Sequence, residues 1–209
     1  MCNKESISLI KNLTTYIGED AAVYIEKFTR GLTLKIRVTK ERESKFGDYL
    51  QSVNGKPQRI TVNGNLDKFS FLITFLHELA HLKAFEIYGK KIKAHGNEWK
   101  SEFIKIIIDS LNNELFPAEI ANIIKEQYVN KKKLSYSSRI KISDSINKYL
   151  NIKIPKRLED FPINASVELI NGMKVKIIEQ KRTRFLCRCL NDNKMYFVQK
   201  KIEVVKQHS

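Results

Sequence analysis

Two histidines and a glutamate stand within a strongly apolar stretch, and this combination limits the fold more than any other feature. The sequence His-Glu-Leu-Ala-His at 77–81 follows the apolar-rich segment 69–76, and further apolar residues extend to Ile87. On an α-helix, residues four apart project from one face about a turn apart. Unpaired polar groups are costly inside a protein, so we expect a metal ion held by His77 and His81. The alternative is an ordinary pair of hydrogen-bonded histidines on a half-exposed helix face.

A third ligand is expected at His95, the next histidine along the chain. Zn²⁺ in catalytic sites is usually held by three protein ligands, with a fourth position open to water. Gly96 permits a tight turn, and Asn97 is a good N-cap for a following helix. His95 would therefore lie on a loop at a helix start, free to fold back over the other two histidines. Glu98 is the alternative ligand, although a first-turn position favours a capping role.

Glu78 directly follows the first ligand and is the candidate catalytic residue. In the H-E-x-x-H motif of metallopeptidases, this carboxylate accepts the proton of the attacking water as general base. A single metal ion on three histidines beside a glutamate favours hydrolysis of an amide bond. Hydrolysis of a phosphodiester is a weaker alternative, because nucleases more often use two metal ions and carboxylate ligands.

The segment from His77 to Lys100 resembles the SprT/Spartan family of zinc metalloproteases. H-E-L-A-H is followed by a short link containing Gly89 and then by H-G-x-x-W-K. The resemblance covers about residues 5–115, and upstream it includes Lys45-Phe46-Gly47-Asp48-Tyr49 and the strand-like segment 59–62. It implies one zinc ion on His77, His81 and His95, with Glu78 as catalytic base. It also implies a protease that degrades proteins crosslinked to DNA or trapped on it.

The chain departs from this family near its C-terminal end. Bacterial members often carry a zinc ribbon with two CxxC pairs, whereas this chain has only Cys187-Arg188-Cys189 there. We therefore expect buried thiols and no second zinc ion. The C-terminal recruitment motifs of the animal members are not visible either, so the regulation of the family is not carried over.

Hydrophobic patterning predicts an α+β protein with three parts. Residues 1–129 would form a zincin-like metalloprotease domain of helices and a small antiparallel sheet, 130–163 a basic linker with a short helix, and 164–209 a basic, β-rich C-terminal module. An edge strand of the first sheet could bind an extended substrate backbone by strand addition. The predicted helices are two before residue 30, the metal helix, 98–111 and 117–129. The metal helix has Asn65 and Asp67 as candidate caps and Gly89 at its end, and Trp99 is expected to pack in the core. The predicted strands are 32–39, 49–53, 59–62 and five short ones after Ala165, with a turn at 54–57.

Basic charge is concentrated toward the C-terminal part of the chain. Residues 117–209 hold 20 basic and 9 acidic residues, against 18 and 14 in residues 1–116. We expect DNA to bind there without sequence specificity, although a generally lysine-rich composition and a solvated connector are alternatives. The candidate contacts are Lys131, Lys132, Lys133, Arg182, Arg184 and Arg188, with Phe185, Tyr196 and Phe197 interspersed.

Other features of the sequence bear on the location of the protein and on its partners. No apolar run approaches the roughly 20 residues of a membrane span, and the first residues lack a secretory pattern. Three cysteines cannot form a paired disulfide framework. We therefore expect a cytoplasmic protein, monomeric by default, that binds DNA and protein substrates but no membrane and could associate with the nucleoid. The competing hypothesis is a nucleic-acid-binding protein whose zinc is structural, which a closed set of four ligands would support.

Overall fold

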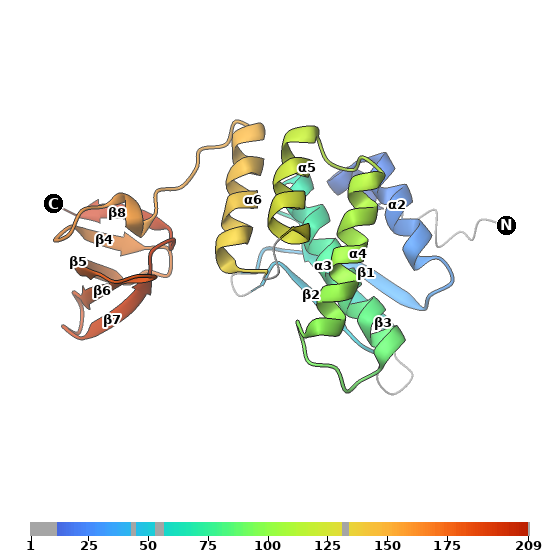
Figure 1. Ribbon diagram of the computed structural model, residues 1–209, viewed down its shortest axis with the longest axis horizontal. Coiled ribbons are helices and arrows are strands. Elements are labelled where there is room, and N and C mark those ends of the chain that lie inside the picture. Colours follow the sequence, from blue (N-terminus) through green and yellow to red (C-terminus); the bar gives the residue numbers. More distant parts are fainter. Residues whose placement is uncertain (1–11, 43–44, 53–56, 131–133, 209) are drawn as a thin grey trace. The chain divides into compact units, whose positions relative to one another are not determined.

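The chain forms two compact units, Met1–Ile146 and Asn147–Ser209. The computed structural model describes residues 12–42, 45–52, 57–130 and 134–208 (Figure 1). Three candidate DNA contacts, Lys131, Lys132 and Lys133, lie outside these ranges, as does most of the turn predicted at 54–57. Helices and two β-sheets make up the described residues, in agreement with the predicted α+β class.

The sheet of the first unit has the strand order β1-β3-β2, with β1 at Leu34–Thr39, β2 at Gly47–Leu50 and β3 at Gln58–Asn63. Strands β2 and β3 form the predicted antiparallel pair, but β1 runs parallel to β3, with Ile36 opposite Ile60. The prediction of an antiparallel sheet is therefore wrong. The last four residues of β3 are all buried, as expected of the central strand of a sheet.

Helix α3 (Lys68–Tyr88) is the structural centre of the first unit. It packs against β2, β3 and α4 (Asn97–Asn112) (Figure 1). Apolar residues surround the helix, as is typical of a buried one, and Phe71, Phe75 and Leu79 are fully buried. Residues 12–17 are also helical. Further helical elements of the unit are α2 (Glu19–Thr29), α5 (Ala118–Ile124), the π-helical turn η1 (Lys125–Val129) and α6 (Tyr136–Tyr149), whose last residues pass into the second unit.

Both ends of α3 are defined by the residues that the sequence indicated. The Asp67 carboxylate accepts hydrogen bonds from the backbone N–H groups of Phe69 and Ser70, each at 3.0 Å. These bonds satisfy donors that have no partner within the helix. At the other end Gly89 adopts a left-handed φ of 76° and donates to the Phe85 carbonyl. These caps define where the helix that carries His77 and His81 begins and ends.

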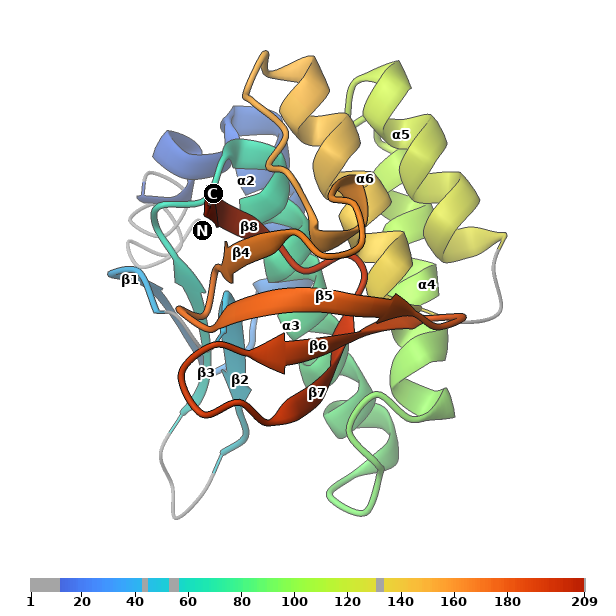
Figure 2. The ribbon, with the colours of Figure 1, turned by 90° about the vertical axis from the view of Figure 1, so that its left-hand side faces the viewer.

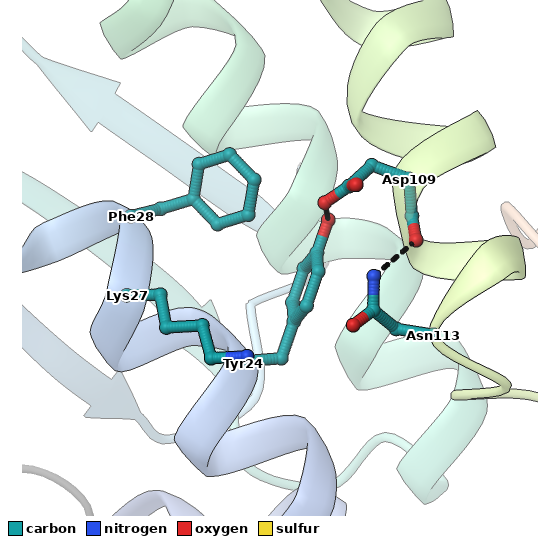
Figure 3. Close-up of a pocket in the computed structure, with 5 residues that line it drawn as sticks. All are labelled: Tyr24, Lys27, Phe28, Asp109 and Asn113. Atoms are coloured by element: carbon teal, nitrogen blue, oxygen red, sulfur yellow. Dashed lines mark hydrogen bonds between the residues drawn. The ribbon is translucent and has the colours of Figure 1, made fainter.

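Helix α2 is joined to α4 by a polar contact at the rim of a small cavity (Figure 3). The Tyr24 hydroxyl donates to Asp109 Oδ2 at 2.9 Å, and burial raises the pKa of Tyr24. The cavity measures about 260 Å³ and is lined by Tyr24, Lys27, Phe28, Asp109 and Asn113. None of the site residues predicted from the sequence lines it.

The second unit is a five-stranded antiparallel sheet with the order β7-β6-β5-β4-β8 (Figure 2). Its strands are β4 (Ser166–Leu169), β5 (Lys174–Gln180), β6 (Arg184–Cys189), β7 (Met195–Gln199) and β8 (Val204–His208), and a 3-10 turn η2 (Leu158–Asp160) precedes them. One face of the sheet packs on Leu158 and Phe161. Five strands were predicted, and five are present in the described part of this unit.

Cys187 and Cys189 lie on the packed face of β6, two residues apart. Both are buried and neither forms a disulfide. Burial raises the pKa of the Cys187 thiol to about 11. The burial of both side chains agrees with the expectation of buried thiols. None of the described helices has the length and apolar character needed to cross a membrane.

The cap of α3 gives a first testable prediction. Asp67→Ala removes both hydrogen bonds to the first turn and should lower the free energy of unfolding by about 1 kcal/mol. Asp67→Asn keeps a cap of similar strength and is the matched control. Urea denaturation of the two variants measures the difference, and equal stability of Asp67→Ala and the unsubstituted chain would contradict this account of the helix start.

Candidate metal centre

Three histidine nitrogens converge at one point beside α3. His77 Nε2 lies 3.0 Å from His95 Nε2, and His81 Nε2 lies 3.1 Å from the same atom. His77 and His81 are half-buried on the helix, whereas His95 is exposed in the segment before α4. These three residues form the metal-capable cluster of the described chain, with their ligand atoms within 4.8 Å of one another.

Hydrogen bonding alone does not account for this convergence. An imidazole nitrogen has a single in-plane position, which holds either a proton or a lone pair. His95 Nε2 therefore cannot form two good linear hydrogen bonds, yet it lies about 3 Å from both other nitrogens. Nitrogens bound tetrahedrally at about 2.0–2.1 Å from a zinc ion would lie roughly 3.3 Å apart. The donor set thus fits one shared metal ion.

A tight turn brings His95 back over the helix. His95 adopts a left-handed φ of 56°, and the N–H of Gly96 donates to the Lys93 carbonyl at 2.8 Å. A Cβ on Gly96 would lie only 2.8 Å from that carbonyl oxygen, so the turn requires glycine here. Gly96 also occupies the N-cap of α4, where Asn97 was expected; Asn97 is instead the first helical residue, because the turn places the extended residue one position earlier.

Trp99 forms a rigid support for all three imidazoles. Its ring centroid lies 4.6 Å from that of His77, 5.1 Å from His81 and 4.6 Å from His95. The side chain is only 2% exposed, and its Nε1–H donates to the His77 carbonyl at 3.4 Å. Phe103 stacks on its other side, with ring centroids 5.0 Å apart. Trp99 therefore belongs to the core, as predicted, and also limits the orientations of the histidine rings.

The surroundings keep the histidines neutral near pH 7. Burial, with the positive charges of neighbouring groups, lowers the pKa of His77 to about 3 and that of His81 to about 4. The pKa of His95 is lowered by burial and by Arg139 and Lys100. Neutral imidazole is the form that binds metal ions. The site is therefore prepared to take a cation without first releasing protons.

Glu78 lies between α3 and strand β2. Burial, followed by the negative charge of Asp48, raises its pKa to about 7, although a hydrogen bond from the Tyr49 backbone N–H acts in the opposite direction. A Cβ on Gly47 would lie 2.8 Å from Glu78 Oε1, so β2 passes very close to the carboxylate. A carboxylate with a pKa near neutrality can both accept and return a proton at physiological pH.

The alternative ligand Glu98 does not join the cluster. It is exposed in the first turn of α4, and the metal-capable group among the described residues contains the three histidines alone. Three ligands leave a fourth tetrahedral position for water, which is the arrangement of catalytic zinc sites, whereas structural sites are closed by four protein ligands.

The three candidate DNA contacts within the described residues belong to the second unit. Arg182 precedes β6, and Arg184 and Arg188 are exposed on that strand. Of the three aromatic residues nearby, Phe185 is buried, Tyr196 is half-buried and Phe197 is exposed.

Two residues near the metal centre were not found by sequence reasoning. The Arg139 charge on α6 lowers the pKa of His77 and His95, although this helix was assigned to a linker. The Tyr49 ring lies parallel to that of His81, with centroids 6.5 Å apart. The spacing of Ser138, Ile142 and Ile146, all buried, was the available signal that α6 packs on a folded domain. No comparable signal marked Tyr49.

No protein-family model matches this chain, and comparisons with curated proteins and with solved structures give no match either. The functional argument therefore rests on the geometry of the site.

The choice between His95 and Glu98 as third ligand can be tested by metal affinity. His95→Ala removes the nitrogen on which the other two converge and should weaken zinc binding by more than about 100-fold, since even changes beyond the ligands cost 10- to 100-fold. Glu98→Ala is the control and should retain the unsubstituted affinity. Competition with a chromophoric chelator measures both; loss of affinity in Glu98→Ala alone would reverse the assignment.

The raised pKa of Glu78 predicts a pH-dependent stability in metal-free protein. Below its ordinary pKa of 4.5 the carboxyl is protonated in both folded and unfolded chains, so burial of Glu78 does not reduce the free energy of unfolding through its charge. As the pH rises toward 7 the unfolded chain ionises first, and stability falls by up to roughly 3 kcal/mol. Metal-free Glu78→Gln should therefore be more stable than the unsubstituted chain at pH 8, with the advantage declining toward pH 4.5.

Urea denaturation across this pH range measures the advantage. Glu98→Gln, which removes an exposed carboxylate of the same α3–α4 region, is the control and should not reproduce it. A constant difference between Glu78→Gln and the unsubstituted chain at every pH would show that titration of Glu78 is not its source.

Proposed function

We propose that this chain is a zinc-dependent metalloprotease that hydrolyses peptide bonds in DNA-associated or DNA-crosslinked proteins. The convergence of three histidine Nε2 atoms beside a buried glutamate carries the proposal. The resemblance of residues 77–100 to the SprT/Spartan family is the reason for proposing DNA-associated proteins as the substrates. The basic second unit, with 14 basic and 6 acidic residues in 147–209, is consistent with recruitment by DNA.

The donor set favours zinc over other biological metal ions. Imidazole nitrogens suit zinc and the later transition metals, whereas calcium and magnesium prefer oxygen ligands. In the described residues no carboxylate belongs to the cluster. A zinc ion held by His77, His81 and His95 would polarise the scissile carbonyl and increase the acidity of a water molecule at the open position.

Glu78 is proposed as the general base and, later, the general acid. Its carboxylate would take the proton of the attacking water and then deliver it to the leaving amine, and a pKa near 7 suits both transfers. The positive charge of Arg139, which already acts on His77 and His95, would favour negative charge that develops on the carbonyl oxygen. Trp99 would keep the imidazoles in their binding orientation.

Strand β2 is the proposed site for the substrate backbone. Among the described strands it pairs with β3 alone, so its other edge is proposed for strand addition. Its residues Gly47 and Tyr49 approach Glu78. A peptide added to this edge would therefore lie close to the proposed base.

The role of Glu78 is tested by proteolysis of a DNA-binding protein, with and without single-stranded DNA. Glu78→Gln should retain one zinc ion per chain and cut at least about 100-fold more slowly, because general acid–base catalysis contributes 10²- to 10⁴-fold. A chelator-treated sample should also be inactive. Cleavage by Glu78→Gln at the unsubstituted rate would remove Glu78 as the base. Stoichiometric zinc and DNA binding without any cleavage would favour the structural-zinc hypothesis.

Gly47 provides a second test of the same arrangement. In Gly47→Ala the added methyl would meet Thr74 Cγ2 at 2.7 Å and Glu78 Oε1 at 2.8 Å, so the carboxylate must move. We expect slower cleavage with unchanged zinc content, measured by peptide hydrolysis and atomic emission. Thr74→Ser/Gly47→Ala is the companion variant: it removes the clash with the Thr74 methyl but not that with Glu78, and should remain slow. Full activity in either variant would contradict the proposed closeness of β2 to the base.

A further inference from the structure

The second unit presents a mixed basic and apolar surface on the side of its sheet opposite the core. Alternation along β5, β6 and β7 buries Val175, Phe185, Cys187 and Val198. The residues between them are half-buried or exposed and point to the other side. We call this side the outer sheet face. On β5, β6 and β7 it includes Lys174, Lys176, Arg184, Leu186, Arg188, Met195 and Phe197, and the β5 bulge places Glu179 on it, opposite Leu186.

Strand register fixes the arrangement of this face around one aromatic ring. Phe197 on β7 is paired with Leu186 on β6. Its diagonal neighbours on β6 are Arg184 and Arg188, since these stand two residues either side of Leu186. Diagonal neighbours in an antiparallel pair are about 7–8 Å apart, within reach of aromatic and long side chains. A ring with an arginine on each side is thus built into the sheet.

The basic side chains of the face have no acidic partners within the described residues. Arg188 is paired directly with Lys176 on β5, and like charges opposite each other destabilise a sheet. The acidic residue of the face, Glu179, stands opposite Leu186 and forms an ion pair with Lys181. The other ion pairs of this unit are between Lys201 and Glu159 and between His208 and Glu168. Folding does not explain why positive charge is concentrated here, whereas an anionic ligand would.

Phe197 distinguishes this face from a merely basic surface. It is 59% exposed, while Phe185 on the core side is 4% exposed. An exposed ring beside unpaired arginines is the combination with which proteins bind unpaired nucleotides: bases stack on the aromatic group and phosphates meet the cations. Duplex DNA would not use the ring in this way, because its bases are already stacked on one another.

We propose that the outer sheet face binds single-stranded DNA, with a base stacked on Phe197 and the phosphates contacted by Arg184, Arg188 and Lys176. The inference rests on the proposed function for the choice of DNA as partner. The binding surface itself follows from register, exposure and charge, and it does not depend on the metal centre.

The ring is tested with a fluorescein-labelled oligothymidylate of about 15 nucleotides, a length within the range that small β-modules cover. Fluorescence anisotropy is measured with the full chain carrying Glu78→Gln, so that proteolysis does not interfere. Phe197→Ala should weaken binding about tenfold. The same substitution should not change the affinity for an abasic strand of equal length, because no base is present to stack. Ile170→Ala, which removes a side chain that is 60% exposed outside the face, is the control and should bind like its parent.

The cations are tested by the salt dependence of the same binding. Arg188→Gln and Lys176→Gln should each reduce the slope of log affinity against log salt by about 0.7, the value for one phosphate contact on a single strand. Lys153→Gln makes the same change of charge at an exposed position outside the sheet and should leave the slope unchanged.

Three results would overturn the proposal: unchanged binding by Phe197→Ala, equal affinity for duplex and single-stranded DNA, or tighter binding of oligouridylate than of oligothymidylate. Failure of the metalloprotease proposal is separate, because it would appear as absent cleavage while these binding results remained as expected.

Discussion

The metal centre depends on the cost of placing polar groups on a buried helix. Helix α3 is apolar around its circumference because it packs against a sheet on one side and α4 on another. Each polar group on such a helix must be satisfied locally. The Glu78 carboxylate accepts a hydrogen bond from β2, and the His77 backbone carbonyl accepts one from Trp99. The imidazole nitrogens of His77 and His81 face His95, and only a shared cation would satisfy all three.

The elements that surround α3 can be understood from this requirement. Gly96 and the left-handed His95 bring the third nitrogen back over the helix. Trp99 packs against the three imidazole rings and is itself held by stacking on Phe103. Gly47 permits β2 to approach the carboxylate. Small residues thus stand where the backbone must come close, and large aromatic residues where the rings need support.

Local signals in the sequence were sufficient to predict α3 and its caps. Asp67 and Gly89 define its ends, and a continuous apolar pattern marks it as buried. The parallel pairing of β1 with β3 could not be predicted, since alternation shows that a strand exists but not which neighbour it joins. His95 was identified as a candidate by its type, but its left-handed conformation is set by the turn. Arg139 acts from a distant helix, and no local pattern indicates that.

Helix α6 changes where the first unit ends. A boundary at residue 129, where the sequence pattern changes, would cut away a helix whose Ser138, Ile142 and Ile146 are buried and whose Arg139 influences two of the three histidines. The first compact unit instead extends to Ile146. A fragment ending before α6 would expose apolar surface and lose a positive charge at the metal centre. An inactive fragment of that kind would reflect where the chain was cut and would say nothing about its chemistry.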